Sequence, residues 1–218
     1  MTNPHGEGAG VSSWEAEGVF VKVCGLARPV DVEAAAEAGA DAVGFVHWEP
    51  SPRHQTLERI RELVAVCPVT SVLVTADLGS EDLLEAATRT GVGAVQVHGP
   101  ASAVAAAAAR RMGLYVIRPM RAGEDPPRMH DDEMLLVDSP HSELPGGSGE
   151  TFDWEALKGI HRPFLLAGGL GPRNVAEAVR KVRPFGVDAS SGLESSPGVK
   201  DTVLIREFVQ AAKESQRP

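Results

Sequence analysis

Two residues that can move protons stand at the ends of apolar runs typical of β-strands. Cys24 ends the run Val19–Cys24, and Asp138 follows the run Met134–Val137. A thiolate can accept a proton and a neutral carboxyl group can donate one, so the two could serve one substrate as base and acid. A lone cysteine is more often a small buried hydrophobic residue, and an aspartate after a strand is more often a cap or turn residue. The pairing, rather than either residue, indicates catalysis.

Two loops have the composition of a phosphate site. Five residues follow the seventh and eighth apolar runs: Gly168, Gly169, Ser190, Ser191 and Gly192. Glycines let backbone N–H groups approach a ligand closely, and a short helical start adds donors. Either loop alone is typical of a tight turn, but both together, in this order, indicate a site that holds a phosphate.

Three further side chains follow predicted strands, and each has two interpretations. Arg53 lies in the proline-rich loop "HWEPSPRH" and is either a solvated surface arginine or a fork for a substrate carboxylate. Gln96 and His98 either line the same site or form hydrogen bonds with a neighbouring loop. The residues themselves leave both questions open.

Eight short runs rich in apolar and β-branched residues recur every twenty to thirty residues or so. They are Val19–Cys24, Ala42–Val46, Thr70–Val74, Ala94–Val97, Leu114–Ile117, Met134–Val137, Phe164–Ala167 and Gly186–Ala189. Helix-like stretches such as "LERIRELVAV" and "RNVAEAVRKV" lie between them. This alternation predicts parallel strands whose outer side is covered by helices.

The predicted fold is an α/β protein with a single (β/α)₈ TIM barrel, in which the residues after the strands form one site. An open doubly wound sheet is the alternative, but it would more naturally have five or six strands and a Gly-x-Gly-x-x-Gly turn, which "CGLARP" is not. We expect residues 1–17 to be a flexible leader and residues 18–218 to form the barrel. The segment 121–132, "RAGEDPPRMHDD", predicts a short or irregular element in place of a fifth helix.

Composition excludes several classes of partner. A formal net charge of −9 disfavours nucleic acid, and no apolar run approaches the roughly 20 residues that span a bilayer. Cys24 and Cys67, in a chain without a secretory signal, favour a cytoplasmic protein with free thiols. A disulfide between them is not expected, because Cys67 precedes the third strand and Cys24 ends the first. Zinc-binding spacings are absent from the sequence, so no metal is predicted.

Sequence motifs from six of the eight predicted strand units, in order, resemble the phosphoribosylanthranilate isomerase family over about residues 21–211. "KVCGL" resembles the first strand of that family, "AGADAVGFV" with "SPR" its second unit, and "VQVHG" its fourth. "LLVDS" with "GGSGETFDW" is similar to the sixth unit, "PFLLAGGL" to the seventh and "RPFGVDASSGLESSPGVKD" to the eighth. Each motif alone is weakly specific, whereas the ordered set is highly specific.

The resemblance implies a (β/α)₈ barrel of the ribulose-phosphate-binding type that needs no cofactor. It implies an Amadori rearrangement of N-(5-phosphoribosyl)anthranilate in tryptophan biosynthesis, with Cys24 as general base and Asp138 as general acid. Arg53 would hold the anthranilate carboxylate, Asp188 would lie beside the sugar hydroxyls, and the two glycine loops would bind phosphate.

The expected partner is this small phosphosugar substrate, and the chain would act as a monomer or homodimer. One alternative is a non-catalytic phosphosugar-binding barrel, which would be expected to have lost Cys24 or Asp138. Another is a different ribulose-phosphate enzyme. An epimerase would have metal-ligating histidines at its strand ends, and a bifunctional histidine–tryptophan isomerase would have an aspartate in place of Cys24.

Overall fold

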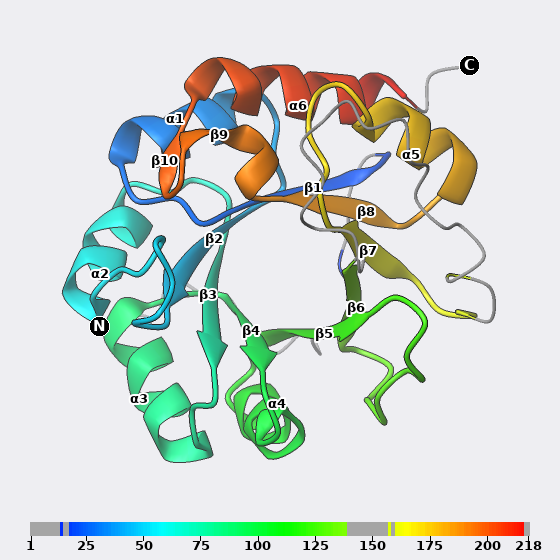
Figure 1. The fold of residues 1–218 in the computed structure, drawn as a ribbon. Helices are drawn as coiled ribbons and strands as arrows, with labels where there is room; N and C mark the ends of the chain where they lie inside the picture. Colours follow the sequence, from blue (N-terminus) through cyan, green and yellow to red (C-terminus); the bar gives the residue numbers. More distant parts are fainter. Residues whose placement is uncertain (1–13, 15–17, 139–156, 158–159, 216–218) are drawn as a thin grey trace, which may run out of the picture.

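The strands of the chain close into a ring. The computed structural model describes residue 14 and residues 18–138, 157 and 160–215. Within them, eight parallel strands follow one another around a barrel, and β8 pairs with β1 to complete it (Figure 1). The strands are β1 (Phe20–Cys24), β2 (Ala42–His47), β3 (Thr70–Ala76), β4 (Ala94–His98), β5 (Tyr115–Arg121), β6 (Met134–Asp138), β7 (Phe164–Ala167) and β8 (Gly186–Ala189). The predicted TIM barrel is confirmed, and the open sheet is excluded.

Helices cover the outside of the ring, and side-chain caps begin two of those described (Figure 1). The described helices are α1 (Pro29–Glu37), α2 (Leu57–Ala65), α3 (Ser80–Thr90), α4 (Ser102–Arg111), α5 (Val175–Val182) and α6 (Thr202–Glu214). The Thr56 hydroxyl accepts the Arg59 N–H at 3.2 Å at the start of α2, and the Asp201 carboxylate accepts the Val203 N–H at 2.8 Å at the start of α6. Gly91 ends α3 in the left-handed conformation, with φ of 73°.

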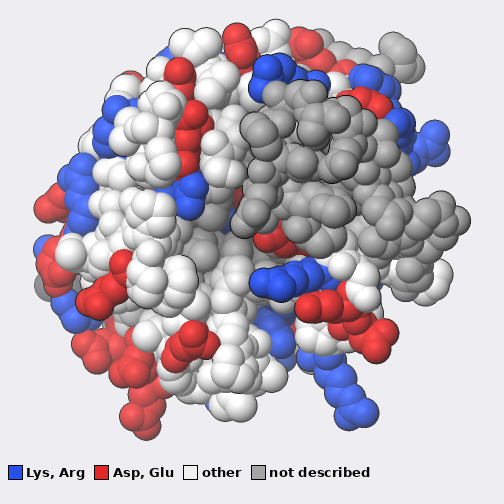
Figure 2. Space-filling view, viewed as in Figure 1, with Lys and Arg blue, Asp and Glu red and all other residues white. Residues whose placement is uncertain are grey.

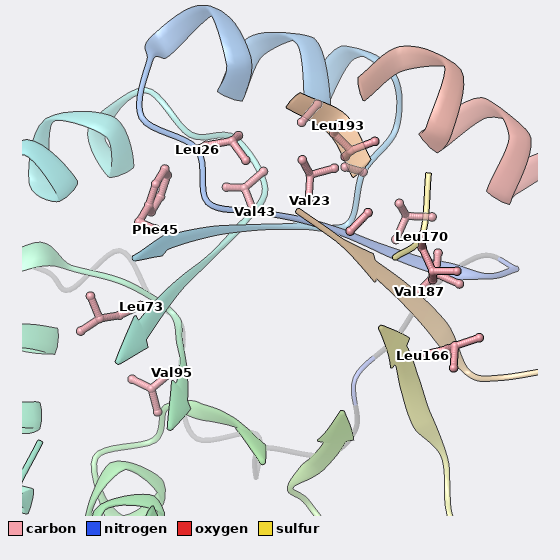
Figure 3. Close-up of a cluster of buried hydrophobic side chains, with 14 of the residues drawn as sticks. Val23, Leu26, Val43, Phe45, Leu73, Val95, Leu166, Leu170, Val187 and Leu193 are labelled. Atoms are coloured by element: carbon pink, nitrogen blue, oxygen red, sulfur yellow. The ribbon is translucent and has the colours of Figure 1, made fainter. Parts of the chain in front are cut away.

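The alternation of side chains along each strand separates two apolar clusters. The outer cluster packs under the helices and includes Val23, Val43, Leu73 and Leu166, which point away from the barrel axis (Figure 3). The inner cluster fills the barrel and comprises Phe20, Cys24, Ala42, Val46, Val72, Val74, Ala94, Ile117, Met134, Leu136, Leu165 and Ala167. Residues two apart along a strand share a face, so this alternation determines which polar side chains enter the barrel.

The connection between β5 and β6 has no helix. Residues 122–133 form turns and irregular backbone, as the sequence predicts. A short 3₁₀ helix, η2 (Ser191–Leu193), and an antiparallel hairpin, β9 (Glu194–Ser196) with β10 (Val199–Lys200), follow β8. The hairpin is not predicted from the sequence, and it brings two charged residues to the site described below.

The expected leader, residues 1–17, lies outside the described residues except for Trp14. The Trp14 ring contacts Phe20 and Tyr115, with centroid distances of 5.6 Å and 5.1 Å. These partners begin β1 and β5, so Trp14 lies at the N-terminal end of the barrel. The glycine-rich loop after β6, within residues 139–156, also lies outside the described part of the chain.

Charges of both signs share the surface. On the described part of the face shown in Figure 2, Lys and Arg side chains are interspersed with Asp and Glu side chains. None of the described helices is both long and apolar enough to cross a membrane.

Candidate active site

The residues singled out from the sequence all belong to the carboxyl ends of the strands or to the loops that follow them. Cys24 and Asp138 are the last residues of β1 and β6, and Gln96 and His98 occupy the end of β4. Arg53 lies between β2 and α2, whereas Asp188 lies in β8. In a parallel barrel these ends surround one mouth, so the fold brings the predicted residues to the same end of the molecule.

Cys24 points into the barrel and is nearly inaccessible. It is 7% exposed and belongs to the inner cluster. Its cross-strand neighbour is Gly44, and a Cβ atom built on Gly44 would lie 2.9 Å from the Cys24 sulfur. Glycine at this position therefore leaves the space that the thiol occupies. Both Cys24 and Cys67 are free thiols, as expected.

A lysine outside the set predicted from the sequence lies beside this thiol. Lys22 precedes Cys24 by two residues, and its side chain is fully buried. Its ammonium donates a hydrogen bond to the Asp188 carboxylate at 2.9 Å. Burial opposes the charge of Lys22, but the Asp188 carboxylate and, more weakly, Cys24 outweigh it and raise the pKa of the lysine.

The same surroundings act on the Cys24 thiol in opposite directions. Burial raises the pKa of Cys24 because it removes water from the thiolate, and the Asp188 carboxylate raises it further. The ammonium groups of Lys22 and Lys200 lower it. With no substrate bound, burial dominates and the pKa of Cys24 lies above its ordinary value.

Asp138 enters the mouth from β6. Met134 and Leu136 belong to the inner cluster, and Asp138 continues this alternation, so the pleat directs its carboxyl group inwards. Asp138 is half-buried. β6 is the third strand from β1 around the ring through β8 and β7, which puts the Asp138 and Cys24 side chains on different sides of the mouth.

The two predicted phosphate loops lie side by side. A Cβ on Gly192 would approach the Leu170 carbonyl oxygen to 2.1 Å, so the loop after β8 passes directly against the loop after β7. Gly168 and Gly169 have φ of 94° and 61°, a conformation that favours glycine. Asn174 orders this loop because its amide donates to the Gly169 carbonyl at 3.0 Å. Ser190 and Ser191 begin the adjoining turn at η2.

Arg53 is held by an acidic partner from the hairpin after β8. Its Nε and Nη2 atoms donate to the two carboxylate oxygens of Glu194 at 2.6 Å and 2.8 Å. The Lys200 ammonium donates to Glu194 at 2.7 Å and to the Ser190 hydroxyl at 3.2 Å. Burial alone would raise the pKa of Glu194, but the bonds from Arg53 and Lys200 outweigh it and lower that pKa.

This network places Arg53 close to Cys24. The Arg53 Cδ atom would lie 2.5 Å from a Cβ on Gly25, the residue after Cys24. Glu194 occupies one edge of the guanidinium group, the edge formed by Nε and Nη2. The opposite edge, formed by Nη1 and Nη2, retains N–H groups with the geometry that a second carboxylate needs.

Gln96 and His98 form a pair on β4. The Gln96 amide lies 2.9 Å from Nε2 of His98, and the Gln96 Oε1 atom is buried without a hydrogen-bond partner among the described residues. Desolvation, together with the Lys22 charge, lowers the pKa of His98, which favours the neutral imidazole. A neutral imidazole and an amide can both donate and accept hydrogen bonds, which suits sugar hydroxyls.

Three residues of the site were missed from the sequence: Lys22, Glu194 and Lys200. The alternation along β1 places Lys22 on the same face as Cys24, but the sequence gives no sign of its partner, Asp188, which is 166 residues away. Glu194 and Lys200 belong to a hairpin too short to show a periodic pattern. Across the described residues there is no group of three or more His, Cys, Asp or Glu side chains that could hold a metal ion.

Comparison with known proteins gives consistent matches. The sequence profile of N-(5'-phosphoribosyl)anthranilate (PRA) isomerase matches residues 21–211. The N-(5'-phosphoribosyl)anthranilate isomerase of Erythrobacter litoralis is 40% identical, over 89% of this chain and 98% of that protein. The crystal structure of TrpF from Jonesia denitrificans has a TM-score of 0.82 and 42% identity, and covers 92% of this chain and 99% of its own.

A third match carries a ligand. It is a crystal structure of phosphoribosyl anthranilate isomerase in complex with reduced 1-(o-carboxyphenylamino)-1-deoxyribulose 5-phosphate. Its TM-score is 0.71 at 31% identity, and the match covers 89% of this chain and 98% of that one. The ligand named there has a benzoate carboxylate at one end and a phosphate at the other.

Proposed function

Because this chain belongs to the N-(5'-phosphoribosyl)anthranilate (PRA) isomerase family, we propose that its strand-end residues perform the reaction of that family in the roles set out here. The chain is an isomerase of tryptophan biosynthesis. It converts N-(5-phosphoribosyl)anthranilate into 1-(2-carboxyphenylamino)-1-deoxyribulose 5-phosphate. The single observation that carries the assignment of roles is an inward thiol on β1 and an inward carboxyl group on β6 at one barrel mouth.

Asp138 is the general acid in the first step. Opening of the furanose ring requires a proton on the ring oxygen while the nitrogen lone pair forms the C=N bond of a Schiff base. The Asp138 carboxyl group supplies this proton from its position at the end of β6. The negative charge that remains on Asp138 balances the positive charge on the protonated Schiff base.

Cys24 is the general base in the second step. The Schiff base withdraws electrons from C2, so the hydrogen on that carbon becomes acidic and the Cys24 thiolate removes it. The electron pair of the broken C–H bond forms the enolamine, which becomes the ketone by losing the proton of the C2 hydroxyl group and gaining one at C1. The base releases the proton it took and the acid recovers the one it gave, so the net change is an isomerisation.

The remaining residues hold the two charged ends of the substrate. The free edge of Arg53 binds the anthranilate carboxylate, and the adjoining loops at Gly168, Gly169 and 190–192 bind the phosphate. Asp188, Gln96 and His98 contact the sugar hydroxyls. A phosphate at one end and a benzoate at the other, as in the ligand of the related complex, fit these two anchors.

The test is a kinetic assay that follows the loss of anthranilate-type fluorescence from the phosphoribosyl substrate. We expect Cys24→Ala and Asp138→Asn each to lower kcat by about 10²–10⁴-fold, the usual contribution of a positioned acid or base. Cys67→Ala is the matched control, because Cys67 lies before β3, away from the strand ends of the mouth, and should retain the parent activity. Parent-like kcat in either of the first two variants would show that its role is wrong.

The non-catalytic alternative is not favoured, since the matching relatives are named as isomerases. Growth of a tryptophan auxotroph that lacks this step, when it expresses the chain, tests the activity itself. Calorimetric binding of the substrate without turnover would instead support a non-catalytic barrel. We further propose that the protein works in the cytoplasm as a monomer or homodimer, the first because both described thiols are free.

A further inference from the structure

The barrel contains a fully buried lysine to which the proposed steps assign no role. Lys22 is 0% exposed and shares the inner face of β1 with Phe20 and Cys24. Burial of an ammonium group is unfavourable unless the charge is paired, and Asp188 supplies the pair at 2.9 Å. A buried pair of this kind is weak support for stability, because well-packed apolar residues often replace such pairs without loss.

The position of the Lys22 ammonium relative to the Cys24 sulfur suggests what the lysine does. Both atoms surround one small space: a Cβ on Gly44 would lie 2.9 Å from the sulfur and 3.4 Å from the lysine Nζ. Both residues are also buried, so the space that they share is shielded from solvent. A cationic neighbour in a site of low dielectric stabilises a thiolate more strongly than it would in water.

We propose that Lys22 is a positioning residue for the isomerisation, whose ammonium group stabilises the Cys24 thiolate, while Asp188 limits how much of that charge acts on the sulfur. This inference rests on the proposed role of Cys24 as the base. It gives Asp188 a second task besides contact with the sugar, since the same carboxylate holds Lys22 in place from β8.

Other charged groups face this thiol from the neighbouring elements. Lys200 approaches from β10, where its ammonium is bound to Glu194 and Ser190. Arg53 lies over Gly25 and is neutralised by Glu194, whereas Asp138 enters from β6. These groups are held by other partners or belong to other strands, so Lys22 is the cation whose removal should most affect the sulfur.

The charges around Cys24 determine the direction in which its pKa should shift when a neighbour is replaced. Desolvation and the Lys22 charge lower the pKa of His98 on β4, which disfavours a second cation at that position. Burial and Asp188 raise the pKa of Cys24, whereas Lys22 and Lys200 lower it. Removal of the Lys22 charge should therefore raise the pKa of the thiol, and removal of the Asp188 charge should lower it.

The experiment measures the thiolate directly, without substrate. In a Cys67→Ser background, the ultraviolet absorbance of the Cys24 thiolate is titrated against pH, with Cys24→Ala as the blank. We expect Lys22→Met to move the titration midpoint upwards by about one unit or more, which is about a tenfold loss of thiolate at a given pH below it. Asp188→Asn should move the midpoint downwards. Lys213→Met, which removes a lysine paired with Asp41 at 2.7 Å elsewhere, should leave it unchanged.

Opposite shifts in the two variants support the proposal, because a merely structural pair would not move the midpoint in opposite directions. Unchanged midpoints, or shifts of the same sign, would overturn it. If Lys22→Met does not fold, the double variant Lys22→Met/Asp188→Asn is compared with Asp188→Asn. If neither Lys22 variant folds, Asp188→Asn alone tests the proposal: a lower titration midpoint supports it, and an unchanged or higher midpoint overturns it.

A second measurement separates this inference from the proposed function. The acidic limb of the pH profile of kcat/KM should move with the titration midpoint in each variant that retains activity. If the midpoints shift as expected but Cys24→Ala retains full activity, the role of Cys24 fails while its coupling to Lys22 stands. If Cys24→Ala is inactive and the midpoints do not shift, the coupling fails while the role of the base stands.

Discussion

Gly44 is the residue on which the geometry of the proposed base depends most directly. It faces Cys24 across the β1–β2 pair and leaves room for both the sulfur and the Lys22 ammonium. Its backbone conformation does not require glycine, since its φ lies outside the left-handed region. The requirement at Gly44 is one of space alone.

We predict that Gly44→Ala lowers kcat/KM about 10–100-fold, because displacement of a reacting group by about 1 Å can cost about 10²-fold in rate. Overpacking should also lower the free energy of unfolding by about 1–3 kcal/mol. Steady-state kinetics and urea denaturation measure the two effects. Gly93→Ala is the control, because a Cβ there meets nothing within 4 Å. Equal kinetics in the two variants would contradict the prediction.

At the scale of single residues, the proposed acid and base could be predicted from the sequence, whereas the charged residues that surround them could not. Cys24 and Asp138 could be found because each follows a strand-like run. Lys22 could not be found, because its role depends on the register that aligns it with Asp188 between β1 and β8. The edge of Arg53 that remains for substrate likewise depends on Glu194, a contact between residues 141 positions apart.

At the scale of elements, the connection between β5 and β6 is fastened by an ion pair rather than by a helix. Arg110, in the last turn of α4, donates to the two carboxylate oxygens of Asp132 at 2.6 Å and 3.0 Å. The hydrogen bond from Arg110 is the main reason that the pKa of Asp132 is lowered. This clamp fixes the segment that leads directly into β6 and Asp138.

We predict that Asp132→Asn lowers the free energy of unfolding at pH 7 by at most about 1 kcal/mol, because the pair is partly exposed to solvent. The folded pKa of Asp132 lies below its unfolded value, so this stabilisation is complete above the unfolded value, about pH 3.9, and is lost as the pH falls through the folded value. Urea titrations from pH 7 to about pH 3 should show the gap between parent and variant closing.

The control for this clamp is Asp125→Asn in the same irregular segment. Asp125 is exposed and has no ion pair with the described residues. Its substitution should leave stability nearly unchanged at every pH. If the difference in free energy of unfolding between the parent and Asp132→Asn stays constant down to the lowest pH, the carboxylate charge does not cause the stabilisation.

The strands could be predicted from the sequence almost to the residue, since β7 and β8 match the expected runs and the others differ only at their ends. Their β-branched and apolar runs are buried on both faces, which makes them continuous in the sequence. β5 extends to Arg121, beyond the predicted Ile117, because its polar end pairs with β6 up to Asp138. Such an extension depends on the neighbouring strand and has no local signal.

At the scale of the whole molecule, the two ends of the barrel have different tasks. The carboxyl ends of the strands carry the proposed chemistry, whereas Trp14 packs on Phe20 and Tyr115 at the opposite end. Residues at the N-terminal end of such barrels serve stability. Substitutions there should separate stability from catalysis.

We predict that Trp14→Ala lowers the free energy of unfolding by about 2 kcal/mol, roughly half the cost of truncating a fully buried tryptophan, because Trp14 is half-buried. Its kcat/KM at a temperature where the variant is folded should equal that of the parent. Trp48→Ala is the control for stability. Trp48 is 42% exposed, so its truncation should lower the free energy of unfolding only slightly. A loss of kcat/KM without a loss of stability in Trp14→Ala would contradict the prediction.

The partnership between Lys22 and Asp188 also has a consequence for biosynthesis on the ribosome. The lysine emerges with the first strand, but its counterion is synthesised 166 residues later. Until then the Lys22 ammonium group has no Asp188 carboxylate to pair with inside the barrel. Burial of an unpaired ammonium group is unfavourable, so β1 of a nascent chain that ends before β8 should stay exposed to water. Completion of the ring therefore awaits synthesis of β8, the last of the eight barrel strands in chain order.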